Sequence, residues 1–360
     1  MPLKGLLLAG GHGTRLRPLT FTGNKHMIPI ANQPMLYYGL RHLKEAGVQE
    51  VGIILGPITE GIREAVGDGS AFGVHVEYIV QGEPRGLAHA VLVARSFLGE
   101  DPFLMYLGDN LLESGPRAYL DAFANGTPAA VVGAVAVDEP SHYGVVELDG
   151  ADRIVSIEEK PKKPRSNLAL VGVYLFTPEV HEVIRDLRPS PRGELEITDA
   201  IRALSERTGR VRVVRLPGWW KDTGQVSDIL VANERVLATR PGGFFENRAQ
   251  VAAGATVTGP VGAGVGTILE RGVTVIGPTI LGAGVRIADG ARVGPYVSAG
   301  DGCVIRQASV ERSILLDNVE LDVPGPVSRS IVGRGSKILR SAAGASARSF
   351  VLGDSSQILL

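Results

Sequence analysis

The strongest chemical signal lies near the N-terminus, where residues 8–18 read LAGGHGTRLRP directly after an apolar run. Glycines let backbone N–H groups approach phosphate oxygens because no Cβ stands in the way. Arg15 adds a permanent, forked positive charge, and a lysine follows ten residues later. The string matches neither the dinucleotide fingerprint nor the Walker loop. We expect a phosphate-binding loop; the alternative is a tight turn with solvated basic side chains. The candidate residues are Gly10, Gly11, Gly13, Thr14, Arg15 and Lys25.

Two aspartates are candidates for holding a divalent cation. Asp109 stands in LGDN after an apolar run, and Asp222 stands in WWKDTG. Mg²⁺ prefers one or two carboxylates together with phosphate oxygens and retained waters. The two aspartates can share an ion only if the fold brings their loops together. The alternative is that each aspartate caps a turn or a helix.

Three further polar motifs follow apolar runs. Gln81 opens QGEPRGLA, and its amide can donate and accept at once, as the edge of thymine or uracil requires. The motif EEKP at residues 158–161 closes a strand with charges that a core would not hold. Arg192 in RGELEITD is a candidate phosphate ligand, or else an ion-pair partner of the neighbouring acids.

Residues 1–240 alternate apolar runs with amphipathic stretches. Alternating strands and helices predict right-handed crossovers and a Rossmann-like, mostly parallel sheet with helices on both faces. Residues 145–148 and 154–158 flank Asp149-Gly150 and predict a hairpin, so antiparallel strands are expected in the second half. The expected strands are 4–9, 51–55, 76–80, 103–107 and 129–137, and the expected helices are 34–46, 59–66, 87–97, 116–123 and 225–239.

The pattern changes after residue 240, and residues 241–360 form a second predicted domain. A six-residue period places aliphatic residues at every first position, small or β-branched residues at the fifth, and mostly glycine or proline at the fourth. This period predicts a left-handed parallel β-helix. Later, Arg312-Ser313-Ile314, Arg329-Ser330-Ile331 and Arg348-Ser349-Phe350 recur at about one coil's spacing. The first-position residues are Val251, Val257, Ala263, Leu269, Val275, Leu281, Ile287, Val293, Ala299 and Ile305.

Composition narrows the function classes. The formal net charge of −1 gives no reason to expect nucleic acid or an anionic membrane as a partner. The single cysteine, Cys303, excludes an intramolecular disulfide and fits a reducing compartment. The sequence shows no signal peptide and no apolar run of about 20 residues, the length of a membrane helix. We therefore expect a cytoplasmic protein.

The motif GGxGTRLxP, followed by the lysine of NKHMIP, resembles the sugar-nucleotide pyrophosphorylases. With the remaining motifs and the hexapeptide domain, the chain is similar to the long form of the glucose-1-phosphate thymidylyltransferases. The resemblance covers essentially the whole chain. It implies dTTP and glucose 1-phosphate as substrates, Mg²⁺ held by Asp109 and Asp222, and dTDP-glucose and pyrophosphate as products. We interpret the β-helix as an assembly or regulatory module and expect a homo-oligomer.

The resemblance also assigns roles to single residues. It implies that Gln81 and the backbone of Gly86 contact the base, and that Asp109 acts beside the triphosphate. Arg15, Lys25, Lys160 and the two aspartates would be the catalytic set. The family usually has glutamine where this chain has His26, next to the nucleotide sugar, so the preference for deoxyribose over ribose is open. The residues expected on the sugar-phosphate side are Asn110, Gly144, Glu159, Lys160, Leu170 and Arg192.

Three other functions stay open at this point. A uridylyltransferase would use UTP in the same site. A bifunctional enzyme would add acyl transfer on the β-helix, but all seven histidines precede the repeats, which leaves that chemistry without its usual proton acceptor. A sugar-nucleotide sensor without activity would be expected to lose charged site residues, and this chain keeps them.

Overall fold

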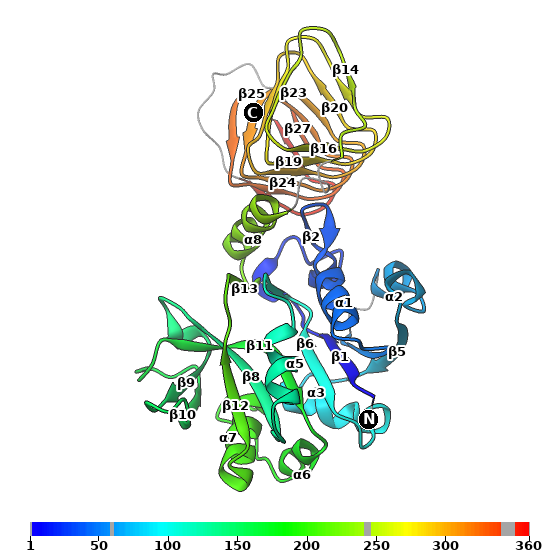
Figure 1. Ribbon diagram of the computed structural model, residues 1–360. Helices are drawn as coiled ribbons and strands as arrows, with labels where there is room; N and C mark the ends of the chain where they lie inside the picture. The colour runs from blue at the N-terminus through cyan, green and yellow to red at the C-terminus, as the bar shows by residue number, and fades with distance from the viewer. Residues whose placement is uncertain (1, 58–60, 241–245, 340–349, 360) are drawn as a thin grey trace. The chain divides into compact units, whose positions relative to one another are not determined.

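A computed structural model describes residues 2–57, 61–240, 246–339 and 350–359 (Figure 1). The chain groups into two compact units, each treated separately below. The first comprises Met1–His12 and Met35–Asp222, and the second comprises Gly13–Pro34 and Thr223–Leu360. The expected boundary at residue 240 falls inside the second unit, because residues 13–34 and 223–240 group with the β-helix.

The first unit is built on a nine-stranded sheet with the order β10-β9-β11-β6-β1-β4-β5, to which β8 and β12 attach. The strands β1, β4, β5 and β6 are parallel, as predicted. Their apolar runs are buried almost throughout, which is typical of a sheet covered on both faces. The bounds are β1 Lys4–Ala9, β4 Glu50–Leu55, β5 His75–Val80 and β6 Phe103–Leu107.

The other half of the sheet is antiparallel around β11, so the sheet as a whole is mixed. Strand β11 (Leu168–Phe176) runs antiparallel to β6, to β8 (Ala130–Ala136) and to β9 (Gly144–Leu148). The predicted hairpin is confirmed: β9 pairs with β10 (Ile154–Glu159), and the Asp149 carboxylate accepts backbone N–H bonds in the turn. Strand β12 (Val211–Arg215) is parallel to β8.

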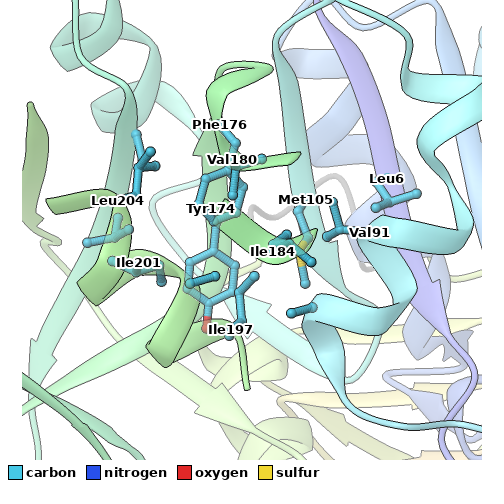
Figure 2. Packing of buried hydrophobic residues seen from close by; sticks show 14 of the residues in the cluster. Leu6, Val91, Met105, Tyr174, Phe176, Val180, Ile184, Ile197, Ile201 and Leu204 are labelled. Carbon is cyan, nitrogen blue, oxygen red and sulfur yellow. The ribbon is translucent and has the colours of Figure 1, made fainter. Parts of the chain in front are cut away.

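Helices cover both faces of this sheet. Leu6 of β1 belongs to a core with Val91, Ile184 and Ile201, which come from three different helices (Figure 2). The neighbouring Leu7 faces α1, where a Cβ on Gly39 would come within 2.8 Å of its Cδ1 atom. The helix bounds are α1 Met35–Glu45, α2 Ile62–Val66, α3 Leu87–Val93, α4 Arg95–Leu98, α5 Arg117–Ala124, α6 Glu179–Arg185 and α7 Ile197–Thr208, with short 3₁₀ turns η3 Ser70–Phe72 and η4 Pro140–His142.

The second unit contains parallel strands that stack in coils, consistent with a left-handed β-helix (Figure 1). Val257 pairs with Val275 and Val275 with Val293, so one coil takes eighteen residues, or three hexads. The first-position column is buried from Ala263 to Ile305, as the period predicts. The strands are β14 Gln250–Val251, β15 Thr256–Thr258, β16 Val261–Ala263, β17 Ile268–Leu269, β18 Thr274–Ile276, β19 Thr279–Leu281, β20 Arg286–Ala288, β21 Arg292–Val293, β22 Val297–Ala299, β23 Val304–Glu311, β24 Ile314–Leu315, β25 Glu320–Ser328, β26 Ile331–Val332, β27 Lys337–Leu339, β28 Val351–Leu352 and β29 Gln357–Leu359.

Later coils vary in length: Ile314 pairs with Ile331, seventeen residues on, and Ile331 pairs with Val351, twenty residues on. Of the third Arg-Ser repeat, Arg348 and Ser349 lie outside the described residues. The unit also holds α8 (Val226–Thr239), which begins with a capping box between Gln225 and Asp228. The segment Gly13–Pro34 contributes η1 Thr14–Leu16, η2 Lys25–Met27, β2 Pro29–Ile30 and β3 Gln33–Pro34. Pro34, expected to open the first helix, ends β3 instead.

Within the described part of the chain, no helix is both long enough and apolar enough to cross a membrane.

Candidate active site

A short antiparallel pair brings the two candidate metal ligands together. Asp109 lies between the end of β6 and β7 (Asn110–Leu112). Strand β7 pairs with β13 (Trp220–Asp222), and the register places Asp222 opposite Asn110. Asp222 therefore lies across from the residue that follows Asp109, although more than a hundred positions separate the two in sequence.

Asn110 joins three segments of this region. Its side chain is 2% exposed. Its Oδ1 atom accepts hydrogen bonds from the Trp220 Nε1–H at 2.7 Å and from the Gly172 backbone N–H at 3.2 Å, and its Nδ2 donates to Asp109 Oδ1 at 3.1 Å. A Cβ on Gly172 would come within 2.6 Å of Asn110 Oδ1, so the close approach requires glycine. These contacts are those of a positioning residue, and the contact predicted between Asn110 and the sugar phosphate stays a prediction.

The carboxylates of Asp109 and Asp222 suit a cation that the protein encloses only in part. Among the described residues, no three His, Cys, Asp or Glu side chains gather as a metal cluster. Two aspartates would leave coordination positions for phosphate oxygens and water, which is the arrangement that Mg²⁺ favours. The residues present therefore fit a divalent cation shared with a substrate.

Three residues predicted to contact the hexose lie together with one further residue, and the four come from three strands and a helix. Gly144 of β9 pairs with Glu159 of β10. Glu159 Oε2 accepts a hydrogen bond from Thr198 Oγ1 at 3.2 Å. A Cβ on Gly144 would lie 2.6 Å from Thr198 Cγ2 and 3.6 Å from Leu170 Cδ1. The structure thus groups three predicted residues with Thr198, which the sequence analysis missed although it stands in the quoted RGELEITD motif.

A ring contact connects this group to the carboxylates. Tyr143, which precedes Gly144, packs edge-on against Trp220 with ring centroids 5.2 Å apart. Trp220 is in turn hydrogen-bonded to Asn110. The predicted hexose residues and the predicted metal ligands therefore belong to one connected group of side chains in the first unit.

The two cations of this region lie in a network of acids. Lys160 Nζ is 3.6 Å from Glu159 Oε1, and Arg192 is 3.5 Å from the same oxygen and 3.2 Å from Glu196 Oε1. Burial raises the pKa of Glu196, opposed by a hydrogen bond from the Ser190 hydroxyl. Lys160 has a φ of 44°, a left-handed conformation that non-glycine residues adopt rarely. The ion pairs expected as the alternative for Arg192 are present, and its phosphate contact stays a prediction.

Residues predicted to contact the nucleotide lie at the carboxyl ends of parallel strands. Gly10 follows β1, Gly56 follows β4 and Gln81 follows β5. A Cβ on Gly10 would come 3.2 Å from Gln81 Oε1, and a Cβ on Gly56 would come 2.2 Å from the Gly10 carbonyl oxygen. This edge is where parallel α/β sheets bind ligands. The loop residue Gly11 is exposed beside it.

The His89 side chain contacts the Gln81 side chain. The sequence analysis did not identify His89 as a site residue. The Gln81 Nε2 atom lies 3.1 Å from His89 Nδ1 and 3.3 Å from the Gly86 carbonyl oxygen. Burial lowers the pKa of His89, and the charge of Arg85 lowers it further, while the charge of Glu83 acts in the opposite direction. The Arg85 NH2 atom lies 3.1 Å from His89 Nε2. The His89 ring and the Gly86 carbonyl oxygen therefore orient the Gln81 amide. The sequence signal that could have indicated this contact is the four-residue spacing between Arg85 and His89.

The remaining predicted residues belong to the second unit. Gly13 (φ 61°) precedes η1, and its carbonyl accepts a bond from Thr20 Oγ1 at 2.8 Å. Thr14 and Arg15 are exposed. At η2, the Asn24 Oδ1 atom accepts the His26 backbone N–H at 2.9 Å and lies 2.7 Å from His26 Nδ1. His26 is only 2% exposed, so Asn24 sets its orientation. Lys25 packs against Gly13, where an added Cβ would lie 3.0 Å from the lysine Cβ.

Comparison with known proteins gives a consistent assignment. The nucleotidyl transferase family model matches residues 4–239, and the GMPPB C-terminal domain model matches residues 275–358. The chain is 43% identical over 359 residues to a glucose-1-phosphate thymidylyltransferase of Streptomyces antibioticus, covering 99% of both chains. It is 43% identical to a protein of the same name from Streptomyces griseus, again covering 99% of both.

A solved structure of a UDP-glucose pyrophosphorylase complexed with UDP-glucose aligns with a TM-score of 0.60 at 27% identity, covering 67% of this chain and 100% of that one. The family model covers more than half of the chain and the full-length relatives agree with it, so the chain belongs to the nucleotidyl transferase family.

Proposed function

We propose that this protein is a glucose-1-phosphate thymidylyltransferase that converts dTTP and glucose 1-phosphate to dTDP-glucose and pyrophosphate with Mg²⁺. The observation that carries the proposal is the β7–β13 pairing, which puts Asp222 across from Asn110, the residue that follows Asp109. The ring contact between Tyr143 and Trp220 connects this pair to the predicted hexose residues. The full-length relatives named as thymidylyltransferases support the choice of substrates.

The reaction is an in-line displacement at the α-phosphorus of dTTP. A phosphate oxygen of glucose 1-phosphate forms the new P–O bond, and the bond to the bridging oxygen breaks and releases pyrophosphate. The attacking phosphate is already ionised at neutral pH, so no general base is required. Catalysis then consists of positioning and charge stabilisation.

The proposed roles follow from charge and position. Arg15 and Lys25 bind the triphosphate together with the loop glycines, and Lys160 orients the attacking phosphate. Asp109 and Asp222 would hold the Mg²⁺, which when bound neutralises charge on the phosphates. Gln81, fixed by His89, contacts the base. We also propose a cytoplasmic location, which the single cysteine fits, and a homo-oligomer with the β-helix as its assembly module.

A uridylyltransferase is the second candidate, and His26 in place of the family's glutamine is the residue that favours it. Pyrophosphate release measured with dTTP, UTP, ATP and GTP, each with several sugar 1-phosphates, tests both. We expect dTTP with glucose 1-phosphate to be best, UTP to be a measurable second, and purine nucleotides to be very poor. A preference for ATP or GTP contradicts the role of Gln81 and the proposed function with it.

A further inference from the structure

The segment Gly13–Pro34 carries Arg15, Lys25 and His26, yet it belongs to the same compact unit as the β-helix. A segment that binds a triphosphate must be held in place, because displacing a binding group by about 1 Å can lower the rate of an enzyme about 100-fold. The contacts that hold this segment within its unit therefore bear on nucleotide binding.

Asn233 of α8 forms the central contact. Its Oδ1 atom accepts the Ala31 backbone N–H at 2.9 Å and the Ser298 hydroxyl at 2.7 Å. Asn233 is 1% exposed, and Ala31 and Ser298 are fully buried. One side-chain oxygen thus connects the segment, the helix and strand β22 of the β-helix. Beside it, Asn32 Nδ2 donates to the Ala299 carbonyl oxygen at 2.7 Å.

The backbone at this contact needs external support. Ala31 and Asn32 form the turn between β2 and β3, with φ values of 48° and 57°. Non-glycine residues keep such left-handed conformations only where surrounding contacts enforce them. The bonds from Ala31 to Asn233 and from Asn32 to Ala299 are the contacts that do so.

A second attachment lies on the other side of Lys25. Thr22 Oγ1 donates to Asp354 Oδ2 at 2.7 Å. A Cβ on Gly353 would lie 3.3 Å from the Cβ of Pro18. The β-helix therefore contacts the segment before and after Lys25. Helix α8 is itself fixed to the β-helix by an ion pair between Glu234 and Arg312.

We propose that Asn233 is a positioning residue for nucleotide binding, through which the β-helix holds the segment that carries Arg15 and Lys25. The inference rests on the proposed function for the identity of the nucleotide. It assigns the β-helix a part in substrate binding in addition to assembly. The residues expected to bind the sugar phosphate, such as Glu159 and Lys160, belong to the first unit and are not held by Asn233.

The test compares three substitutions in the full-length protein. Asn233→Leu removes both acceptor bonds, and Ser298→Ala removes only the bond from the β-helix. Asn233→Asp keeps an acceptor oxygen and loses no bond at Nδ2, which has no hydrogen-bond partner among the described residues. Ser330→Ala is the matched control, because Ser330 is a buried serine of the β-helix whose hydroxyl, like that of Ser298, is hydrogen-bonded, but to the Ser328 carbonyl oxygen and the Phe350 backbone N–H within the β-helix.

The measurements are KM for dTTP, KM for glucose 1-phosphate, kcat, and amide hydrogen exchange in residues 13–34. We expect Asn233→Leu to raise KM for dTTP about 10- to 100-fold, with KM for glucose 1-phosphate nearly unchanged and faster exchange in the segment. Ser298→Ala should give a smaller change in the same direction. Asn233→Asp should recover most of the loss, and Ser330→Ala should match the wild type.

Equal changes in both KM values, or a lower kcat alone with unchanged exchange in residues 13–34, would overturn the proposal and leave Asn233 a purely structural residue. If the wild type prefers another nucleotide, the proposed function fails, but the same comparison made with that nucleotide still decides the role of Asn233. The exchange measurement needs no nucleotide and decides whether the segment is held as inferred.

Discussion

His181 gives the sharpest test of the first unit's stability, because it is a titratable group buried without polar partners. It lies on α6, is 6% exposed and stacks on Phe103 with ring centroids 5.8 Å apart. Neither ring nitrogen has a hydrogen-bond partner among the residues that the structure describes. The pKa of His181 is lowered from 6.5 to about 4, mainly by burial and also by the charge of Arg95, while the charge of Glu100 acts in the opposite direction.

The sign of the pH effect follows from this shift. Above pH 6.5 the imidazole is neutral in the folded and the unfolded protein, so it causes no pH dependence of stability. Between pH 6.5 and 4 the unfolded state binds the proton first, so the free energy of unfolding falls as the pH falls. At 1.36 kcal/mol per pKa unit, the full loss is about 3 kcal/mol below pH 4, of which about 2 kcal/mol is present at pH 5.

His181→Leu removes the titration and fills the apolar site with a side chain of similar size. Urea unfolding should be followed by tryptophan fluorescence, because both tryptophans, Trp219 and Trp220, belong to the first unit. Relative to pH 7.5, the wild type should lose about 2 kcal/mol more than His181→Leu at pH 5. His75→Gln, on the exposed end of β5, is the control and should behave as the wild type. Identical pH dependence in His181→Leu and the wild type would refute the assignment.

Four further predictions concern the site. Asp109→Asn or Asp222→Asn should abolish turnover while the urea midpoint stays near that of the wild type, and near-normal activity at ordinary Mg²⁺ would contradict the shared-ion model. Asn110→Leu should lower the free energy of unfolding by ~2–5 kcal/mol, because the buried Gly172 N–H and the partly buried Trp220 Nε1–H lose their acceptor. Asn110→Asp should cost less in the same urea experiment. His89→Phe should raise KM for dTTP about fivefold through loss of one bond to Gln81, with KM for glucose 1-phosphate as the internal reference. The ratio of kcat/KM for dTTP over dUTP should be roughly 10–200, the effect of one methyl group, and a ratio near 1 would show that the methyl group is not sensed.

The fold was predicted well wherever the signal was local. The apolar run at residues 4–9 gave β1 with the same bounds, and the Asp149-Gly150 turn gave the β9–β10 hairpin. The hexapeptide column, for example Val275 and Leu281, is buried inside the β-helix. The antiparallel insertion of β11 between β6 and β9 was not predicted in detail, because strand order depends on contacts between distant segments.

Prediction of the candidate site was limited in the same way, by contacts between distant segments. The sequence singled out Asp109 and Asp222 separately, and only the β7–β13 register brings them together. His89 and Thr198 were missed because their importance comes from the partners they meet, Gln81 and Glu159, rather than from a motif of their own. Their roles in the reaction, like those of the other site residues, stay predictions.

The two attachments of the segment Gly13–Pro34 limit how the β-helix can change in length during evolution. Adjacent strands lie about 4.8 Å apart, so an added or lost coil shifts every later coil by that distance. Ser298 and Ala299 lie on β22, and Asp354 follows β28, three strands along the same wall through β24 and β26. A coil inserted between them would pull Asp354 away from Thr22 or Ser298 away from Asn233. Coils before β22 carry neither attachment, so whole-coil insertions and deletions should be tolerated there and rejected between β22 and β28.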